Sequence, residues 1–405
     1  MNMTPRLILI ALLLTIAASA ATAAEGRLTL LSGKSHKSVT VTSITKDLIT
    51  YTTLDGEKQQ ADMDDLVGIT YSKRTTLHGT PSEDYVEVRL RGGDVVFGTL
   101  AASEDEEIAL RSRFVGPIRF GLDDVAEIRF VQAWQNAVER PAPTGVESEW
   151  DVFYYRTLDH VEGTLLRLTR GSVVVQPRIG GSHAIFYENL LMVRFADVPA
   201  PELPTGRLAV IRLSDGSRLT LSELTSDGKN IRGTTLRGTK VDLRLVDVLA
   251  LYQTGGRFTY LSDLPAEEVK IVPWIGESYA WDRPRTDRSF LDAPLISGGE
   301  TFLKGLGVIS GTAITYRLDG KYRLFTARLA LDDTAEQEGD VRFEVIVNGK
   351  SRFMSDVIRR QKPGTEPLRI PPINIAGAKH LTLKVHYVDD FVRDFANWLE
   401  PMLVR

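Results

Sequence analysis

Five aspartates near the C-terminus are the residues of this chain best suited to binding an ion. They follow two apolar stretches and are Asp332, Asp333, Asp389, Asp390 and Asp394. Carboxylate oxygens are hard ligands, and several of them on neighbouring loops can hold Ca²⁺. Acidic residues also commonly close strands and turns while they face solvent. The sequence therefore predicts either a structural calcium site at these residues or a set of solvated loop acids, and no other cofactor.

Aromatic residues in the same region suit a second kind of chemistry, the stacking of sugar rings. The candidates are Tyr279, Trp281, Tyr387, Phe391 and Trp398. An aromatic ring can stack on the apolar face of a sugar while polar groups reach the hydroxyls. Trp281 lies in an irregular stretch that favours exposure, whereas the setting of Trp398 favours the core. With polar contacts added, the predicted ligand-binding set is Trp281, Lys304, Asp333, Arg393 and Trp398.

No arrangement typical of catalysis accompanies these residues. The chain has no GxSxG, HExxH, phosphate-loop or strand-to-helix GxGxxG motif. His380 and His386 are the closest pair among its six histidines. Six residues apart on a strand, they would lie about 20 Å from each other, too far to share a metal. A glycosidase would need two carboxyl groups about 5 to 9.5 Å apart, which spacing along the chain does not define. We therefore predict that the protein is not an enzyme.

These residues belong to a C-terminal module, residues 271–405, in which apolar and polar residues alternate. Four apolar residues occupy every second position from Val341 to Val347, just before a turn at Asn348-Gly349. Successive side chains of a strand point to opposite faces, so this segment is a half-buried strand that enters a hairpin turn. Several such runs, without a long stretch of helical periodicity, indicate a β-sandwich.

A set of short motifs follows a distinctive order along this module. They are Lys304-Gly305-Leu306-Gly307-Val308, Tyr316-Arg317-Leu318-Asp319-Gly320, Tyr322 and Phe325 with Leu331-Asp332-Asp333, Val341-Arg342-Phe343-Glu344-Val345 with Asn348-Gly349-Lys350, Ala376-Gly377-Ala378 with Leu381-Thr382-Leu383, and Asp394-Phe395-Ala396-Asn397-Trp398. Together, over about a third of the chain, they resemble the NPCBM family of carbohydrate-binding modules. The resemblance implies a jelly-roll sandwich of the galactose-binding type, an accessory role, a glycan or polysaccharide ligand and often a bound Ca²⁺. The family often has His where this chain has Ile309, and an acid where it has Asn397.

Between residue 25 and this module the chain repeats one pattern four times. Each unit opens with alternating residues and a turn, and it ends with an acidic or amide residue before a short apolar phrase. The closing phrases begin at Asp65, Asp124, Asn189 and Asp247, roughly 58 to 65 residues apart. Such lengths predict small β-meanders of about five strands, SH3-like in shape. The predicted modules are residues 25–77, 84–138, 150–197 and 206–254.

The first 24 residues have the layout of a secretory signal peptide. Arg6 precedes an apolar run from Leu7 to Ala18, and Ala21-Thr22-Ala23 provides an A-x-A cleavage site. The run is about 12 residues long, shorter than the roughly 20 that span a bilayer, and an uncleaved anchor is the alternative. The chain contains no cysteine, which excludes disulfides, thiolate metal sites and a lipoprotein anchor. We expect a secreted or periplasmic protein with no membrane span after signal removal.

Two functions for this all-β chain stay open. The net charge of −4 and the pI of about 6.0 give no reason to expect nucleic acid as a partner. In the first function, the sandwich of an exported, non-catalytic protein binds a glycan, and the β-modules act as spacer or interaction modules. In the second, the protein is an envelope scaffold that binds other proteins, and the sandwich has lost its sugar site. An aromatic and acidic cleft favours the first, and a contiguous exposed apolar patch favours the second.

Overall fold

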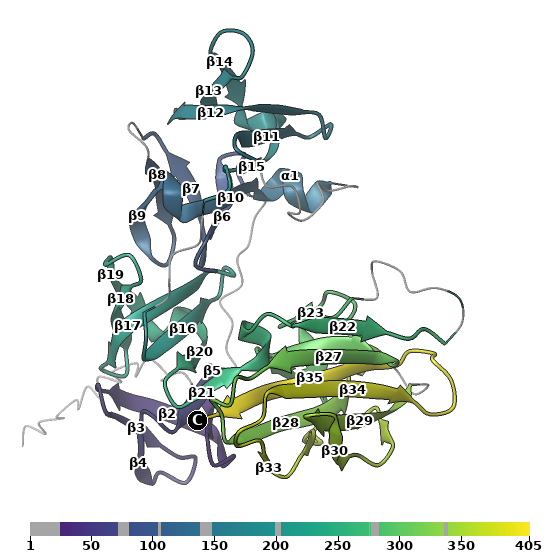
Figure 1. The fold of residues 1–405 in the computed structure, drawn as a ribbon. Coiled ribbons are helices and arrows are strands. Elements are labelled where there is room, and N and C mark those ends of the chain that lie inside the picture. Colours follow the sequence, from purple (N-terminus) through teal and green to yellow (C-terminus); the bar gives the residue numbers. More distant parts are fainter. Residues whose placement is uncertain are drawn as a thin grey trace, which may run out of the picture. The chain divides into compact units, whose positions relative to one another are not determined.

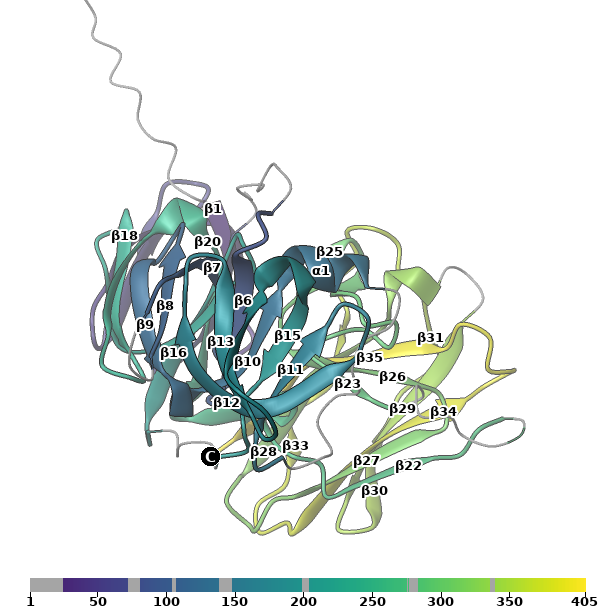
Figure 2. The same ribbon diagram turned by 90° about the horizontal axis from the view of Figure 1, so that it is seen from above.

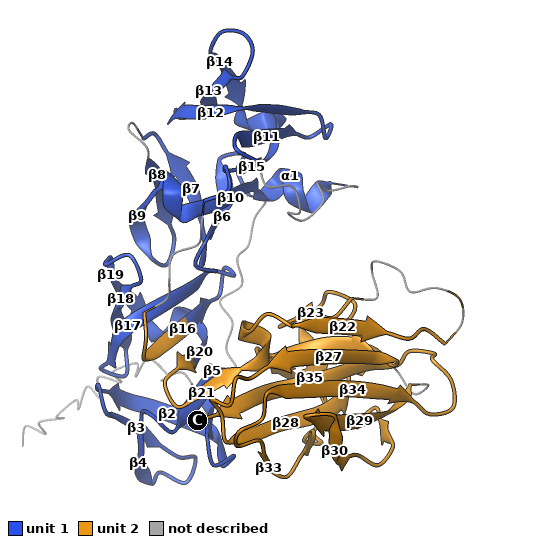
Figure 3. Cartoon of the chain, in the orientation of Figure 1, with its two compact units in different colours: residues 1–202, 211–252 blue, residues 203–210, 253–405 orange. Residues whose placement is uncertain are grey.

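Strands dominate the computed structural model of the chain, as the sequence predicts. It describes residues 25–71, 81–103, 107–137, 148–198, 204–274, 276, 283–335 and 339–405, and the predicted signal peptide lies outside these ranges. The chain divides into two units, residues 1–202 with 211–252 and residues 203–210 with 253–405 (Figure 3). Within the described ranges there is one α-helix, α1 (Val131–Asn136). None of the described helices is long and apolar enough to cross a membrane.

In the described part of the chain, four sets of five strands precede the C-terminal region (Figure 1). Set 1 contains β1 (Glu25–Leu30), β2 (Ser35–Ile44), β3 (Leu48–Thr52), β4 (Lys58–Asp62) and β5 (Leu66–Tyr71). Set 2 contains β6 (Tyr85–Leu90), β7 (Val95–Ala101), β8 (Glu107–Ser112), β9 (Gly116–Gly121) and β10 (Val125–Phe130). Set 3 contains β11 (Asp151–Tyr155), β12 (His160–Leu168), β13 (Ser172–Pro177), β14 (His183–Phe186) and β15 (Leu190–Arg194). Set 4 contains β16 (Arg207–Leu213), β17 (Arg218–Ser226), β18 (Asn230–Thr235), β19 (Lys240–Arg244) and β20 (Val248–Gly255).

The sets share one internal strand order. In set 1, β1 pairs with both β2 and β5, β2 pairs with β3, and β3 pairs with β4. Sets 2 and 3 repeat these antiparallel pairings, and the first and last strands of set 4 also pair. The strands form because every second side chain is apolar and turns inward, as Val96 and Leu100 do in β7.

The residue that opens each closing phrase holds the first hairpin of its set. A short 3-10 turn precedes the last strand of sets 2, 3 and 4: η1 (Leu122–Asp124), η2 (Tyr187–Asn189) and η3 (Leu245–Asp247). The backbone carbonyl groups of Asp65, Asp124, Asn189 and Asp247 accept hydrogen bonds of 2.7 to 3.0 Å from the N–H groups of Leu31, Arg91, Arg156 and Ser214, respectively. The spacing read from the sequence therefore corresponds to one backbone contact made four times.

Neighbouring sets join through their last strands. β10 of set 2 pairs antiparallel with β15 of set 3, centred on Ile128 and Val193, and Figure 2 shows these strands side by side. β20 of set 4 pairs with β5 of set 1 in the same way, centred on Leu251 and Ile69. Gly68 permits this approach, because an added Cβ would lie 2.8 Å from the Leu251 carbonyl oxygen. Sets 3 and 2, and sets 4 and 1, therefore share continuous sheets.

The C-terminal unit is a sandwich of two antiparallel sheets. One sheet contains β21 (Phe258–Tyr260), β23 (Arg285–Thr286), β26 (Gly305–Ile309), β28 (Leu324–Leu331), β32 (Leu368–Arg369), β33 (Ile373–Asn374) and β35 (Phe395–Val404). The other contains β22 (Glu268–Ile271), β27 (Thr312–Arg317), β29 (Asp340–Val347), β30 (Lys350–Met354), β31 (Ile358–Arg359) and β34 (His380–Tyr387). β24 (Leu295–Ser297) and β25 (Glu300–Phe302) form a separate hairpin. Two 3-10 turns, η4 (Leu261–Asp263) and η6 (Asp333–Ala335), also belong to this unit. β21 and β22 enter the sandwich ahead of residue 271, since they pair with β35 and β27.

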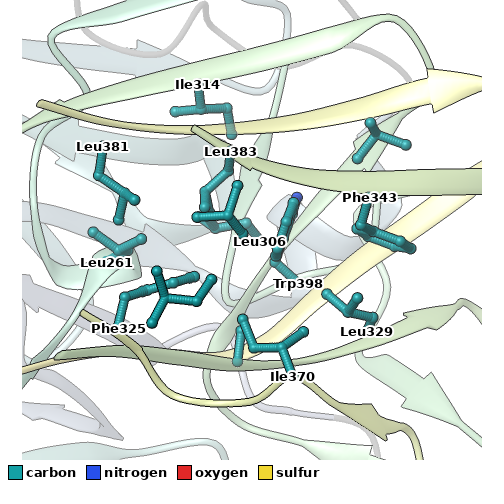
Figure 4. Close-up of a cluster of buried hydrophobic side chains, with 14 of the residues drawn as sticks. Leu261, Leu306, Ile314, Phe325, Leu329, Phe343, Ile370, Leu381, Leu383 and Trp398 are labelled. Atoms are coloured by element: carbon teal, nitrogen blue, oxygen red, sulfur yellow. The ribbon is translucent and has the colours of Figure 1, made fainter. Parts of the chain in front are cut away.

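The core of the sandwich lies between the two sheets, as Figure 4 shows for part of it. The apolar residues of β29 point into this core, which confirms the alternation predicted from Val341 to Val347. The predicted turn after β29 is also confirmed. Asn348 and Gly349 have φ values of +48° and +76°, which suit a type I′ hairpin turn, and Val347 pairs with Lys350 across it.

Candidate functional site

Trp398 is a core residue and not a ligand contact, which corrects its place in the predicted binding set. Its side chain is fully buried in β35, and its ring packs edge-on against Phe343 with 4.9 Å between the ring centroids. Figure 4 shows both rings inside the cluster of apolar side chains between the sheets. A buried ring offers no face to a sugar. The predicted platform Trp281 lies outside the described residues.

Lys304 is also an internal residue, which corrects its predicted role as a polar contact to a ligand. Its side chain is 2% exposed. The ammonium group donates to Asp263 Oδ1 and Asp287 Oδ2, each at 2.6 Å, and lies 5.4 Å from the centre of the Tyr260 ring. Because Asp263 follows β21 and Asp287 follows β23, Lys304 ties both segments to the start of β26.

Asp332 and Asp333 direct their carboxylates to groups of the protein. Buried Asp332 accepts hydrogen bonds from Asn397 Nδ2 at 2.9 Å and from Thr334 Oγ1 at 2.6 Å. Asp333 accepts the N–H groups of Gly298 at 2.9 Å and Gly299 at 2.8 Å, in the turn of the β24–β25 hairpin. The hydrogen bond to Asp332 also explains why this chain has Asn397 where the family often has an acidic residue. An acid at this position would place two carboxylates together in the core.

The other three aspartates lie on the segment between β34 and β35. Asp390 Oδ1 accepts the Val392 N–H at 2.7 Å, and Asp394 Oδ1 accepts the Asp340 N–H at 2.9 Å. Asp389 is exposed, and its own N–H donates to Asp340 Oδ1 at 3.4 Å. Within the described residues, no three His, Asp or Glu side chains come together as metal ligands would. The five predicted ligands do not converge, and the calcium site stays a prediction.

Arg393 occupies the same segment in a backbone conformation that is rare for residues other than glycine. Its φ is +57°, its side chain is half-buried, and its carbonyl oxygen accepts the Phe395 N–H at 2.7 Å. Gly339 packs against it, because a Cβ at Gly339 would lie 2.4 Å from the Arg393 carbonyl oxygen. The contribution of Arg393 to ligand binding stays a prediction.

Two aromatic rings at this end of the sandwich form the best candidate for a sugar platform. Trp274, which follows β22, is 48% exposed. Its ring contacts that of Tyr387, at the end of β34, with 5.2 Å between the centroids and an angle of 62° between the planes. Exposed Asp389 and Asp390 lie two and three positions after Tyr387 in the chain, and the ring of Phe391 is 50% exposed. We call Trp274 and Tyr387 the aromatic platform.

The platform is held by backbone contacts around Gly311. The Tyr387 hydroxyl donates to the Val272 carbonyl oxygen at 2.7 Å, and the Val272 N–H donates to the Gly311 carbonyl at 3.0 Å. Gly311 has a φ of +78°, and an added Cβ would lie 2.2 Å from the Val272 carbonyl oxygen and 2.4 Å from the Tyr387 hydroxyl. A glycine is therefore required at this position for Tyr387 to reach Val272.

A pocket opens along the edge of the sandwich. This pocket has a volume of about 630 Å³, and it lies between β22 and β27 of one sheet and residues 283–286 and β26 of the other. Its walls are mainly aliphatic, with Arg283, Thr286 and Tyr316 as polar groups, and burial raises the pKa of the Tyr316 hydroxyl. Because it offers mainly branched aliphatic side chains, it suits a sugar ring less well than the aromatic platform does.

The comparison with known families decides what this sandwich is. Residues 258–404 match the model of the NPCBM/NEW2 domain, and the match begins at the first residue of β21. The C-terminal sandwich is an NPCBM/NEW2 domain. The resemblance seen in the sequence motifs is thereby confirmed, and the family belongs to the carbohydrate-binding modules.

Two curated proteins are similar to part of this chain. A protein of Renibacterium salmoninarum provisionally named endo-alpha-N-acetylgalactosaminidase is 30% identical over 134 residues, which are 31% of this chain and 8% of that protein. Alpha-1,3-galactosidase B of Akkermansia muciniphila is 30% identical over 118 residues, which are 29% of this chain and 15% of that protein. This chain therefore spans only a small part of the length of these relatives.

Among solved structures, similarity extends to two modules from Clostridium perfringens. The CBM51-2 and INT domains of ZmpB in complex with GlcNAc are 23% identical, with a TM-score of 0.32, over 46% of this chain and 38% of that one. The CBM51 module of GH95 in complex with methyl-galactose is 22% identical, with a TM-score of 0.31, over 36% of this chain and 99% of that one.

Asp394, in the segment between β34 and β35, should make the stability of the NPCBM/NEW2 domain depend on pH. Burial raises the pKa of Asp394 to about 6. Hydrogen bonds from Ser310 and the Asp340 N–H lower this pKa, and the negative charges of Asp340 and Asp390 raise it. The folded state thus holds a proton that the unfolded state, with an ordinary pKa near 3.8, has released. Stability therefore falls as pH rises from about 4 to about 6 and then levels off.

Replacing Asp394 by Asn should remove this fall. Between pH 4 and pH 7.5 the Asn variant should gain about 2 to 3 kcal/mol relative to the wild type, since one pKa unit corresponds to about 1.4 kcal/mol. Pulse-labelling hydrogen exchange of β35 peptides across a urea gradient measures the difference in the full chain. Asp389→Asn, at an exposed carboxyl of the same segment, is the control and should follow the wild type. Parallel pH profiles for wild type and Asp394→Asn would contradict the assignment.

Proposed function

We propose that this protein is an exported, non-catalytic carbohydrate-binding protein whose NPCBM/NEW2 domain holds a glycan on the aromatic platform. The observation that carries the proposal is the match of residues 258–404 to a carbohydrate-binding family, combined with an exposed tryptophan braced by a tyrosine in the same domain. The β-strand sets before it act as a spacer or as interaction modules.

The chemistry of the platform suits a sugar ring. The Trp274 ring has an apolar face large enough to stack on the C–H face of a pyranose, and contact with Tyr387 limits its rotation before the ligand arrives. The neighbouring carboxylates of Asp389 and Asp390 are exposed, so they can accept hydrogen bonds from sugar hydroxyls. An exposed ring of this kind can bind the end of a glycan chain or a single sugar residue.

An envelope scaffold is the second candidate, and one observation favours it. The strand sets are joined by sheet pairing, β10 to β15 and β20 to β5, and so form continuous sheets whose strands could bind partner proteins. Under this function the partners are envelope proteins. Export itself rests on the signal-peptide layout of residues 1–24.

Glycan-array binding of the full chain tests the proposal. The array should include terminal α-galactosides and α-N-acetylgalactosaminides, because the curated relatives carry the names of enzymes for such sugars. We expect selective binding to a subset of glycans. Repeating the experiment with Ca²⁺ and then with a chelator decides whether the predicted calcium is needed.

Retained hydrogen-exchange protection of β35 shows that the domain is folded during the assay. A folded chain that binds no glycan in either condition would exclude carbohydrate binding and leave the scaffold function. Release of a reducing sugar from any bound glycan would instead contradict the non-catalytic assignment.

A further inference from the structure

Sets 2 and 4 meet at a joint that is different from the last-strand pairing described above. The strands involved are β7 and β17, which follow the first hairpin turn of each set, and Val95 pairs antiparallel with Arg218. The contact is reciprocal. The Thr220 N–H donates to Asp94 Oδ2 at 2.9 Å, and the Phe97 N–H donates to Ser217 Oγ at 3.0 Å.

This joint has the character of a two-fold interface between two copies of the same module. Asp94 and Ser217 occupy the same place in their sets, because each carbonyl group closes the first hairpin by accepting the N–H of Leu90 or Leu213 at 2.8 Å. Phe97 and Thr220 each lie three positions later. In each set, the backbone N–H of the third residue after the hairpin-closing position donates to the side chain at the hairpin-closing position of the other set. Isologous dimers form through self-complementary surfaces of this kind.

Among the residues that the structure describes, set 3 presents the same surface without a partner set at the start of β12. Its hairpin is closed at the equivalent position by Asp159, whose carbonyl group accepts the Tyr155 N–H at 2.8 Å. β11 and β12 pair without a register shift, as β6 and β7 do. The difference lies in exposure. Asp94 is 5% exposed in its joint, whereas Asp159 and His160 are exposed.

Set 3 also carries an exposed apolar side chain, on the loop that follows β13. Gly98 of set 2 and Gly163 of set 3 each approach the backbone of a neighbouring strand, at Arg111 and Gln176, so the following loops correspond. In set 2 this loop carries Arg113. Burial raises the pKa of Asp215 in set 4, and the charge of Arg113 acts against that increase, so the two residues interact across the joint. In set 3 the corresponding loop carries Ile179, which is 92% exposed.

The equivalent surface of set 1 is altered in a way that discourages pairing. Lys34 occupies the hairpin-closing position of set 1, where its carbonyl group accepts the Leu30 N–H. Its ammonium group can only donate hydrogen bonds, unlike the side chains of Asp94 and Ser217. A register shift interrupts the β1–β2 pairing between Gly26 and Leu28, and Ser38 opposite it has a φ of +55°. Bulges of this kind twist a strand edge away from new partners.

We propose that two copies of this chain dimerise through set 3, with the two β12 strands paired about a two-fold axis as β7 and β17 are within one chain. Asp159 of each copy accepts the Glu162 N–H of the other, as Asp94 accepts the Thr220 N–H. The His160 residues face each other across the axis, in the place of Val95 and Arg218. The altered surface of set 1 stops further addition, so the product is a dimer and not a filament.

A single engineered cysteine tests this arrangement, since the chain has no cysteine of its own. Directly opposed residues of an antiparallel pair have Cα atoms about 4.5 to 5.5 Å apart, within the range that a disulfide spans. In the full chain, His160→Cys should form a disulfide-linked dimer in most molecules under mild oxidation. His36→Cys, on the altered surface of set 1 and one position beyond the equivalent of His160, is the control and should stay monomeric.

Sedimentation equilibrium of the wild type under reducing conditions measures the same association without a cross-link. Asp159→Lys should raise the dimer dissociation constant at least tenfold, because it replaces an acceptor with a cation, while the exposed position leaves the fold intact. A wild type that is monomeric at about 100 μM would overturn the proposal. A mixed disulfide between Cys variants at 160 and 36 would overturn it too, since that product requires head-to-tail contact of sets 3 and 1.

Discussion

Replacing Lys304 by Met should destabilise the NPCBM/NEW2 domain by about 3 kcal/mol. The ammonium group is buried and donates to two carboxylates at 2.6 Å, so its removal leaves Asp263 and Asp287 facing each other without a cation. Breaking a buried ion pair by removing one partner typically costs about 3 to 5 kcal/mol, and partial exposure of the two aspartates places the expected cost at the lower end. Hydrogen exchange of β21, β26 and β35 peptides in the full chain measures the loss.

Two further variants separate the charge effect from a packing effect. Lys270→Met removes an exposed lysine that pairs with Glu268 at 2.9 Å, and it should cost less than about 0.5 kcal/mol. Adding Asp263→Asn and Asp287→Asn to Lys304→Met should restore much of the lost stability, because no uncompensated charge remains. If the amide hydrogens of Lys304→Met exchange at the wild-type rate, the ion pairs of Lys304 with Asp263 and Asp287 do not contribute to the stability of the domain.

Replacing Trp274 by Ala should weaken glycan binding about 10- to 100-fold. An exposed aromatic ring that is already braced loses little freedom on binding, and central aromatic contacts commonly contribute about 2 kcal/mol or more. Titration of the full chain with the strongest glycan from the array measures the change. Gly311→Ala should act in the same direction, because its Cβ would displace the Tyr387 hydroxyl that donates to Val272.

The matched control for Trp274 is a second exposed tryptophan outside the domain. Trp150, which is 39% exposed and precedes β11, can be replaced by Ala without effect on glycan binding if the platform is the site. Equal loss of binding from both substitutions would point to a general effect on folding. Full binding by Trp274→Ala would move the site elsewhere, and the pocket that Arg283 lines would be the next candidate.

Regions with regular alternation could be predicted from sequence because their structure depends on local chemistry. Val341 to Val347 alternate apolar and polar residues, and the following Asn-Gly pair tolerates the left-handed backbone that a tight hairpin requires. The four closing phrases were equally visible, since each repeats the same acidic or amide residue and apolar run. The joining of the sets was not visible, because pairs such as Ile128 with Val193 come from distant segments.

The candidate site was predicted less well than the fold. Trp274 was missed because no local pattern distinguishes it from Trp281, which lies seven positions later in the same irregular stretch. Only its contact with Tyr387, more than 100 positions later in the chain, distinguishes it. Lys304 was assigned to the ligand because a lysine is usually exposed, yet the structure supplies two carboxylates that stabilise its buried ammonium.

The sequence by itself determined the all-β architecture, the family of the C-terminal sandwich and the residue types available for binding. These follow from side-chain alternation, turn residues and motif order, each of which is a property of neighbouring positions. Only the tertiary structure decided which of those residues are free to contact a ligand and which are engaged within the fold. Asp332 bonds to Asn397 and Asp333 to the β24–β25 turn, and Trp398 lies in the core. A buried polar group must find partners wherever the fold brings them, and sequence distance does not reveal where that is.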